Sequence, residues 1–175
     1  MTLPLHPGRY ALDLTHTQIG FVVTHLGLTP IRGVFARFDG GLDVGATPAE
    51  CALDVSVELA SLQSSHPGRE QHVQGEDFFD STRHPTMLFR STGIEGDGNR
   101  WSCAGELTLR GMTAPITLHT ELTGRALFPL DQKEHIGFIG TGTLSRRTFG
   151  VAPNIPSLLL SDDIRIELSV QLIAP

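Results

Sequence analysis

The eight histidines are the residues of this 175-residue chain most able to do chemistry, because imidazole binds metals and exchanges protons near neutral pH. They are spread along the chain, and no HxH or HExxH spacing and no His/Cys pair at ligand spacing occurs. Convergence of His16, His25 and His72 at one end of a fold would favour an enzyme or a metal-dependent protein acting on a hydrophobic substrate. That is the alternative hypothesis. The scattered spacing instead predicts a protein without a metal site and without catalytic residues.

Nucleophilic catalysis finds no support in the sequence. Asp13 and His16 could form an acid–base pair, but local hydrogen bonding at a turn between the first two strands is the simpler interpretation. The two cysteines, Cys51 and Cys103, lie at apolar positions of two expected strands. They are predicted to be buried free thiols, with a disulfide as the alternative. No GxSxG motif and no glycine-rich phosphate-binding motif is present.

Two pairs of basic residues could bind a ligand or serve the fold. Arg146 and Arg147 could form an anion site, but one arginine paired with a carboxylate and the other solvated is the simpler interpretation. Arg69 and His72, three positions apart, would share one side of a helix. They could contact a ligand head group, although we expect them to fasten that helix over the mouth of the fold.

A period-two alternation of apolar and polar residues must build the frame for these side chains. Successive side chains of a strand point to opposite faces, so each alternating run predicts a half-buried strand. Gly40-Gly41, residues 96–99 and residues 111–115 separate such runs and predict turns. Strands are therefore expected over 19–24, 51–59, 87–91, 101–110, 116–122 and 164–172.

One segment, residues 68–81, lacks this alternation. A short helix is expected over about residues 68–75, with Pro67 near its first turn and Gly75 limiting its length. Phe78 and Phe79 follow this helix. They could plug one mouth of a barrel or simply complete the core there.

Many short strands and one short helix predict an all-β chain, in a single domain over residues 1–175. We expect an extended antiparallel β-barrel of about eight strands with the helix near one mouth, and such a barrel encloses packed side chains or one ligand. Gly105, Gly140 and Gly142 fall at inward positions, where they either leave space or bend strands. The candidate ligand-binding residues are Phe21, Val23, Phe38, Val55, Val57, Phe78, Phe79, Phe89, Leu107, Leu109, Phe138 and Leu168.

Composition and net charge argue against some classes of partner and location for the chain. A formal net charge of −6 at pH 7 argues against nucleic acid as a partner, since phosphate binding needs a basic face. No stretch approaches the roughly 18 apolar residues of a transmembrane helix. Residues 1–6 show no secretory signal. We therefore expect a cytoplasmic protein that does not span a membrane.

A series of motifs runs in order from Tyr10 to Leu172. Its most specific stretch is Arg69-Glu70-x-His72-Val73, Asp77-Phe78-Phe79-Asp80 and Pro85-x-x-x-Phe89-x-Ser91-Thr92. The other motifs are Tyr10-x-x-Asp13-x-x-His16-Thr17 with Phe21 and His25, Gly33-x-Phe35-x-x-Phe38-x-Gly40, Gly105-x-Leu107-Thr108-Leu109-x-Gly111-x-Thr113 and Arg146-x-x-Phe149-Gly150-Val151. In this order they resemble the YceI-like family, with Glu70 and Thr148 standing where Asp is common.

The resemblance implies a lipocalin-like barrel that binds or transports a polyisoprenoid, an isoprenoid quinone or a fatty-acid-like amphiphile in its lumen. It implies no catalysis, and no cofactor other than such a bound lipid. It also implies that a homodimer can form, since members are often dimers. Many members are exported to the periplasm, and this chain lacks the signal for that route. The shared polar positions are expected to serve the fold rather than the ligand; they are Asp13, His16, Arg69, His72 and Arg146.

Overall fold

Strands dominate the computed structural model, which describes residues 5–175. In this described part, one α-helix, α1 (Pro67–Val73), and two short 3-10 helices, η1 (Pro48–Glu50) and η2 (Leu59–Ser61), lie between strands. None of these helices is long and apolar enough to cross a membrane. The strands are β1 (Gly8–Leu12), β2 (Gln18–His25), β3 (Thr29–Phe35), β4 (Phe38–Val44), β5 (Ala52–Glu58), β6 (Leu62–Gln63), β7 (Thr86–Asp97), β8 (Arg100–Leu109), β9 (Met112–Phe128), β10 (Lys133–Ser145) and β11 (Asp163–Ile173).

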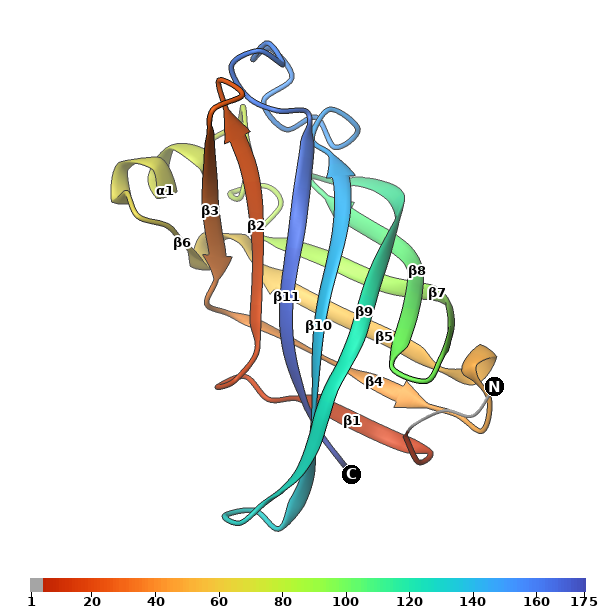
Figure 1. Ribbon diagram of the computed structural model, residues 1–175. Helices are drawn as coiled ribbons and strands as arrows, with labels where there is room; N and C mark the ends of the chain where they lie inside the picture. The colour runs from red at the N-terminus through yellow and green to blue at the C-terminus, as the bar shows by residue number, and fades with distance from the viewer. Residues whose placement is uncertain (1–4) are drawn as a thin grey trace.

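Eight of the strands within residues 5–175 form a closed antiparallel ring (Figure 1). Their order is β1-β4-β5-β7-β8-β9-β10-β11, and β11 closes the ring by pairing with β1 at Ala11↔Ile173 and Leu12↔Leu172. This confirms the predicted antiparallel barrel of about eight strands. The barrel is elongated, because β9 has 17 residues and β10 has 13, and their hairpin extends at the lower end in Figure 1.

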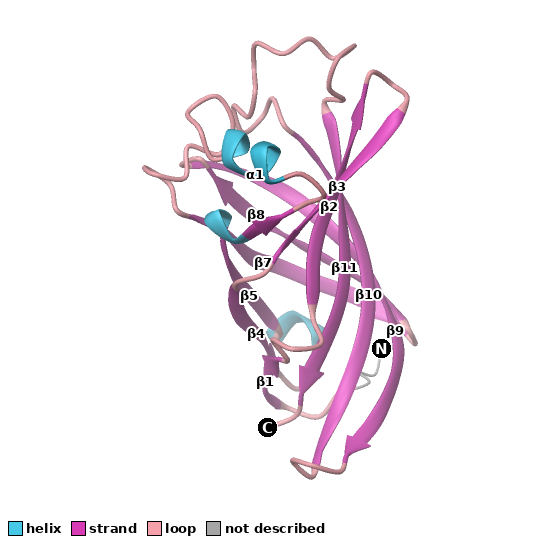
Figure 2. Cartoon of the chain, turned by 90° about the vertical axis from the view of Figure 1, so that its left-hand side faces the viewer, coloured by secondary structure: helices cyan, strands magenta, loops and turns pink. Residues whose placement is uncertain are grey.

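At the upper end in Figure 1 the wall continues through β2, β3 and β6. β2 pairs with residues 165–169 of β11, so β1 and β2 share that strand at different heights. β2 then pairs with β3, and β3 pairs with β6 at two positions. The helix α1 lies at this end (Figure 2), and the side-chain amide of Gln74 just after it donates to the carbonyl of Leu59 at 3.0 Å. The predicted short helix near one barrel mouth is confirmed.

Side chains that alternate inward form the core of the barrel. In β8 every second residue from Trp101 to Leu109 is buried, while those between them are half-buried or exposed. One cluster of buried side chains surrounds Leu107 and Phe149, and a second surrounds Tyr10 and Ile136 toward the lower end. The alternation read from the sequence therefore describes the inward face of the wall.

One predicted glycine-rich turn is wrong, and a second is correct at Gly111 but shorter than predicted. Gly40-Gly41 lies inside β4, where a side chain at Gly40 would come within 2.1 Å of the Asp54 carbonyl oxygen and φ is +149°. Close approach of β5, and not a chain reversal, requires glycine there. The turn between β8 and β9 is Arg110-Gly111, both with positive φ, and residues 112–115 already belong to β9. The hairpin predicted around Gly98 does join β7 to β8.

Candidate functional site

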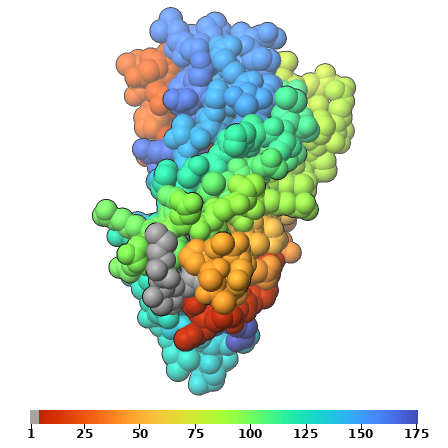
Figure 3. Space-filling view, turned by 90° about the vertical axis from the view of Figure 1, so that its right-hand side faces the viewer, coloured from red at the N-terminus to blue at the C-terminus, as the bar shows by residue number. Residues whose placement is uncertain are grey.

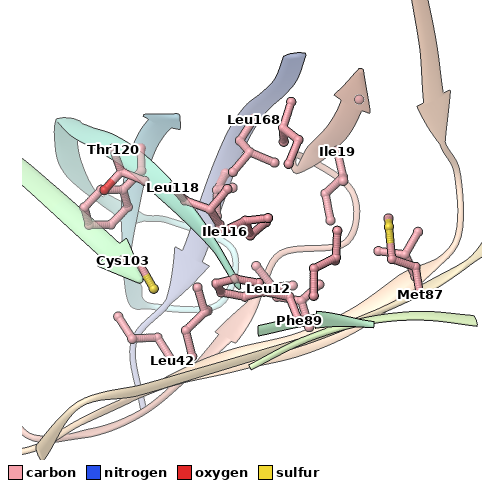
Figure 4. A pocket seen from close by; sticks show the side chains of 18 of the residues that line it. Leu12, Ile19, Leu42, Met87, Phe89, Cys103, Ile116, Leu118, Thr120 and Leu168 are labelled. Atoms are coloured by element: carbon pink, nitrogen blue, oxygen red, sulfur yellow. The ribbon is translucent and has the colours of Figure 1, made fainter. Parts of the chain in front are cut away.

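The barrel encloses a cavity of about 240 Å³ whose lining comes from every strand of the ring. Figure 4 shows side chains from different strands, among them Leu42, Leu118 and Leu168, that project into this space. Along β11 the lining runs from Ile164 to Leu172, which corresponds to about 27 Å at the usual rise of a strand. The cavity is therefore long and narrow, and it follows the axis of the barrel.

The lining is apolar along nearly its whole length. Thr120 contributes a hydroxyl group to the lining, and this hydroxyl donates a hydrogen bond to the carbonyl of Trp101 at 3.4 Å. The indole N–H of Trp101 in turn donates to the carbonyl of Gly98 at 3.0 Å. Among residues 5–175, no Asp, Glu, Lys, Arg or His side chain lines the cavity. Such an interior can hold a hydrocarbon chain by contact area, and it presents no group for acid–base chemistry.

Most of the residues chosen from the sequence as ligand-binding candidates meet in this cavity. Eight of them come from six strands, where alternation of apolar side chains places them on one surface, and Phe79 comes from the segment after α1. The candidates that line the cavity are Phe21, Val55, Val57, Phe79, Phe89, Leu107, Leu109, Phe138 and Leu168.

The structure places the other three candidates away from the cavity. Val23 is buried in β2 but does not line the cavity. Phe38 is half-buried where the two core clusters meet. The ring of Phe78 packs edge-on against the ring of His72, with centroids 5.0 Å apart. Contact of any candidate with a ligand stays a prediction.

The lining also includes residues that the sequence analysis does not predict as ligand-binding. Cys103, Ile116 and Leu118 lie on inward faces that the alternation had already identified, so the same signal could have found them. Leu12 and Leu42 line the lower part of the cavity from β1 and β4. β1 has only five residues, which is too short for a periodic pattern to be recognised.

The inward glycines are predicted either to leave open space or to bend strands. In the structure, neighbouring side chains fill the space that these glycines leave. A side chain at Gly105 would come within 2.3 Å of the Phe89 ring, and one at Gly142 within 2.8 Å of Leu118. At Gly33 the ring of Phe21 occupies the corresponding position, at 2.7 Å. These glycines therefore let large side chains lie flat against the wall.

Both cysteines are free and both line the cavity, as expected for buried thiols, although Cys51 is only half-buried. Burial raises the pKa of the Cys103 thiol to about 12. At neutral pH this thiol is protonated, and a protonated thiol is a weak nucleophile. Its surroundings make Cys103 an apolar part of the wall.

A polar network lies at the lower end of the barrel, outside the cavity lining. Asp13 accepts hydrogen bonds from the backbone N–H groups of Thr15 and His16 and from His16 Nδ1, the last at 2.8 Å. The Gln171 amide bridges Asp13, at 3.0 Å, and His135 Nδ1, at 2.7 Å. Burial opposes ionisation of Asp13, but the hydrogen bonds from His16 and Thr15 outweigh it and lower the pKa of Asp13 to about 2. Local bonding at the β1–β2 turn is confirmed as the role of Asp13 and His16.

The histidines of the alternative hypothesis stand on separate elements. His16 binds Asp13, His25 pairs with Leu160 through the backbone, and His72 packs against Phe78. Within residues 5–175, no group of three or more His, Cys, Asp or Glu side chains is placed to hold a metal ion. The structure thus gives the metal-dependent alternative no site in the part of the chain that it describes.

The prediction that one of Arg146 and Arg147 pairs with a carboxylate while the other is solvated is wrong. Both arginines contact the same carboxylate. Asp162 Oδ1 lies 2.9 Å from Arg146 Nη2 and 2.7 Å from Arg147 Nε. Arg146 is completely buried and donates to five carbonyl groups of the segment that follows it. Desolvation lowers the pKa of its guanidinium, and Asp162 opposes this effect. Arg146 organises a loop, and its charge does not face the cavity.

Comparison with known proteins agrees with this architecture. A family model described as the YceI-like domain matches residues 10–172. A UPF0312 protein from Photorhabdus laumondii is 30% identical over 162 residues, which cover 91% of this chain and 84% of that protein.

Two solved structures are similar in fold. The YceI protein of Campylobacter jejuni superposes with a TM-score of 0.78 at 31% identity, over 87% of this chain and 90% of that chain. A polyisoprenoid-binding domain from Saccharophagus degradans, implicated in plant cell wall breakdown, superposes with a TM-score of 0.68 at 14% identity, over 95% of this chain and 98% of that chain. Because the family model spans nearly the whole length of the sequence, this chain belongs to the YceI-like family.

Proposed function

We propose that the chain binds one long apolar molecule in the barrel cavity and carries it without chemical change. The molecule is a polyisoprenoid, an isoprenoid quinone or a fatty-acid-like amphiphile. The observation that carries the proposal is the unbroken apolar lining along the barrel axis, with one hydroxyl and no charged side chain. The polyisoprenoid-binding domain of the same fold from S. degradans supports it.

The shape of the cavity favours a single extended chain over a compact ligand. Each buried CH2 group contributes about 0.8 kcal/mol, so a tail that follows the barrel axis binds tightly without a polar contact. A cavity of about 150 Å³ engineered in another protein holds benzene. By that scale, the 240 Å³ here accommodates roughly ten carbon atoms before any side chain moves. A longer tail then requires Met87 and the half-buried Phe21 and Phe79 to change rotamer, which flexible methionine does readily.

The direct test is extraction of the purified protein with organic solvent, combined with native mass spectrometry. We expect an apolar molecule in one-to-one ratio with the chain. A protein that carries no extractable amphiphile, and that takes up neither a polyisoprenol nor a fatty acid when these are supplied, would contradict the proposal.

A pair of matched variants separates cavity binding from adhesion to the surface. Val55→Trp fills the cavity from β5, whereas Val34→Trp adds the same side chain to β3 outside the cavity lining. With cis-parinaric acid as a fluorescent probe, we expect Val55→Trp to weaken binding at least about tenfold, since each 1.4 kcal/mol corresponds to a factor of ten. Val34→Trp should bind as the unchanged protein does, and equal effects of both variants would place the probe elsewhere.

A further inference from the structure

Two loops lie side by side at the upper end of the barrel (Figure 1, and the orange-red and blue regions at the top of Figure 3). One is the β2–β3 turn with its flanks, residues 25–31, and the other is residues 151–161 between β10 and β11. The N–H of Leu26 donates to the carbonyl of Leu159 at 3.0 Å, and Ser161 and Thr24 exchange two hydrogen bonds of 2.9 Å. We call this paired surface the leucine tip.

Four leucines of the leucine tip project into solvent. Leu28 is 79% exposed and Leu158 is 77% exposed, while Leu26 and Leu159 are each 43% exposed. The opposite side of the same loop faces the barrel, because Val151 lines the cavity. One short segment therefore joins the upper end of the cavity to an exposed apolar surface, and contiguous surfaces of this kind mark interaction sites.

The backbone at Leu26 shows that this leucine is placed at a conformational cost. Leu26 has φ of +54° and Gly27 has φ of +66°, and the N–H of Leu28 donates to the carbonyl of His25 at 3.0 Å. A β-turn with positive φ at both central residues favours Asn-Gly, because residues with a branched or bulky side chain avoid positive φ. An exposed leucine at such a position has no packing reason to be there, and a strained residue of this kind points to a function.

The leucine tip has no charged residue of its own, and Arg147, which donates to its Pro153 and Ile155 carbonyls, is paired with Asp162. Residues 25–31 and 151–161 contain no Asp, Glu, Lys or Arg, although such residues make up 18% of the chain and the net charge is −6. An uncharged apolar surface is complementary to the apolar layer of a bilayer and not to a charged partner. The loop is preformed as well, since buried Arg146 donates to the carbonyls of Val151, Ile155 and Leu160.

We infer that the leucine tip inserts into the surface of a lipid bilayer and sets the upper end of the cavity against it. This inference rests on the proposed function, because a carrier of an apolar chain must exchange that chain with the membrane phase. The leucines would enter the boundary between head groups and acyl chains, and the strained Leu26 would lie at the contact.

The experiment is flotation of the full chain with phosphatidylcholine vesicles. We expect the unchanged protein to bind, and Leu28→Ser/Leu158→Ser to bind at least about tenfold more weakly, as loss of two exposed leucines predicts. The matched control is Leu127→Ser/Leu130→Ser, which removes leucines that are 64% and 85% exposed in the β9–β10 hairpin at the opposite end (Figure 1). This control should bind within twofold of the unchanged protein.

Leu26→Asn gives a test that misfolding cannot imitate. Asparagine suits the positive φ of this turn, so the variant should raise the melting temperature while vesicle binding falls several-fold. Binding should change little with added salt or with phosphatidylglycerol in the vesicles, because no charge takes part. A Leu26→Asn variant with unchanged vesicle binding would overturn the inference.

Other results would also overturn it. Absence of vesicle binding by the unchanged protein, or equal losses in the tip and hairpin variants, would remove the role of the leucine tip. If Leu28→Ser/Leu158→Ser converts a dimer to a monomer and leaves vesicle binding intact, the surface joins two copies of the chain. Cis-parinaric acid binding by the same variant keeps the two proposals apart, since it should stay unchanged when only docking is lost.

Discussion

At the scale of single residues, two buried ionisable groups have pKa values that are shifted in opposite ways. Cys103 lies in the cavity wall with a pKa of about 12, so it remains a neutral thiol near pH 7. Asp13 is also buried, yet its hydrogen bonds hold it ionised with a pKa of about 2. The difference follows from partners, since the carboxylate receives hydrogen bonds and the thiol lies among apolar groups.

Asp13 should make the stability of the barrel depend on pH in the acid range. Its folded pKa of about 2 lies below the ordinary value of 3.8, so its ionised form stabilises the fold above about pH 4. That contribution, about 2 kcal/mol, is lost as the pH falls through 2, because each pKa unit corresponds to about 1.4 kcal/mol. Urea unfolding of the unchanged protein and Asp13→Asn between pH 5 and 2 measures it. The free-energy difference between the two proteins should shrink toward pH 2, whereas Asp97→Asn, at the exposed β7–β8 turn, should leave the acid dependence unchanged.

At the scale of elements, the loop between β10 and β11 depends on one buried side chain. The Arg146 guanidinium reaches carbonyls from Val151 to Ser161 and also contacts Asp162. A planar group with several fixed donors can serve these acceptors together, and a lysine ammonium cannot. The shape of the loop is thus set by a residue that precedes it.

Replacement of Arg146 should therefore weaken the fold whether or not the charge is kept. We expect Arg146→Lys and Arg146→Met each to lower the free energy of unfolding by about 3 kcal/mol or more, because buried carbonyls lose their donors. Arg147→Lys is the control, since the Arg147 side chain is 43% exposed and makes its ion pair and its bonds to Pro153 and Ile155 at the surface, where an ion pair contributes about 1 kcal/mol at most. Urea unfolding at pH 7 measures all three, and a loss for Arg146→Lys no larger than for Arg147→Lys would contradict the expectation.

The elements of the barrel differ in how far the sequence predicts them. The alternation of β8 is local, so the sequence alone predicts both its location and its inward face. The partners of Arg146 lie on a loop without periodicity, and its complete burial could not be predicted. Gly40 was assigned to a turn because glycine serves turns and close strand contacts alike, and only the register of β4 against β5 decides between them. Most of the cavity lining followed from alternation, whereas its lower end on short β1 did not.

At the scale of the whole molecule, the barrel has different chemistry along its axis. The polar network around Asp13 lies at the lower end, the apolar cavity occupies the interior, and the leucine tip forms the upper end. A ligand in the cavity would touch strands from all sides of the ring. Binding and stability should therefore be coupled, because a ligand that binds only the closed barrel shifts the unfolding equilibrium.

Loading the cavity should raise the melting temperature. At a free ligand concentration about 100 times Kd the stabilisation is about 2.7 kcal/mol, which corresponds to roughly 5–10 °C for a chain of this size. Differential scanning fluorimetry of protein stripped of lipid, with and without added cis-parinaric acid, measures the shift. Val55→Trp should lose most of the shift and Val34→Trp should keep it. An equal shift in both variants would indicate binding outside the cavity.

Closure of the ring by β1 and β11 has a consequence for how the chain folds. The pairs Ala11↔Ile173 and Leu12↔Leu172 join residues from opposite ends of the sequence. Pairing at such separation requires closure of a loop almost as long as the chain, which makes folding slow compared with that of proteins rich in local contacts. During synthesis, β1 and β2 are made first, and β11, the strand that pairs with both of them, is made last. Until β11 arrives, their free edges and the apolar inner wall are open to other chains, so aggregation competes with folding most strongly before the last strand is in place.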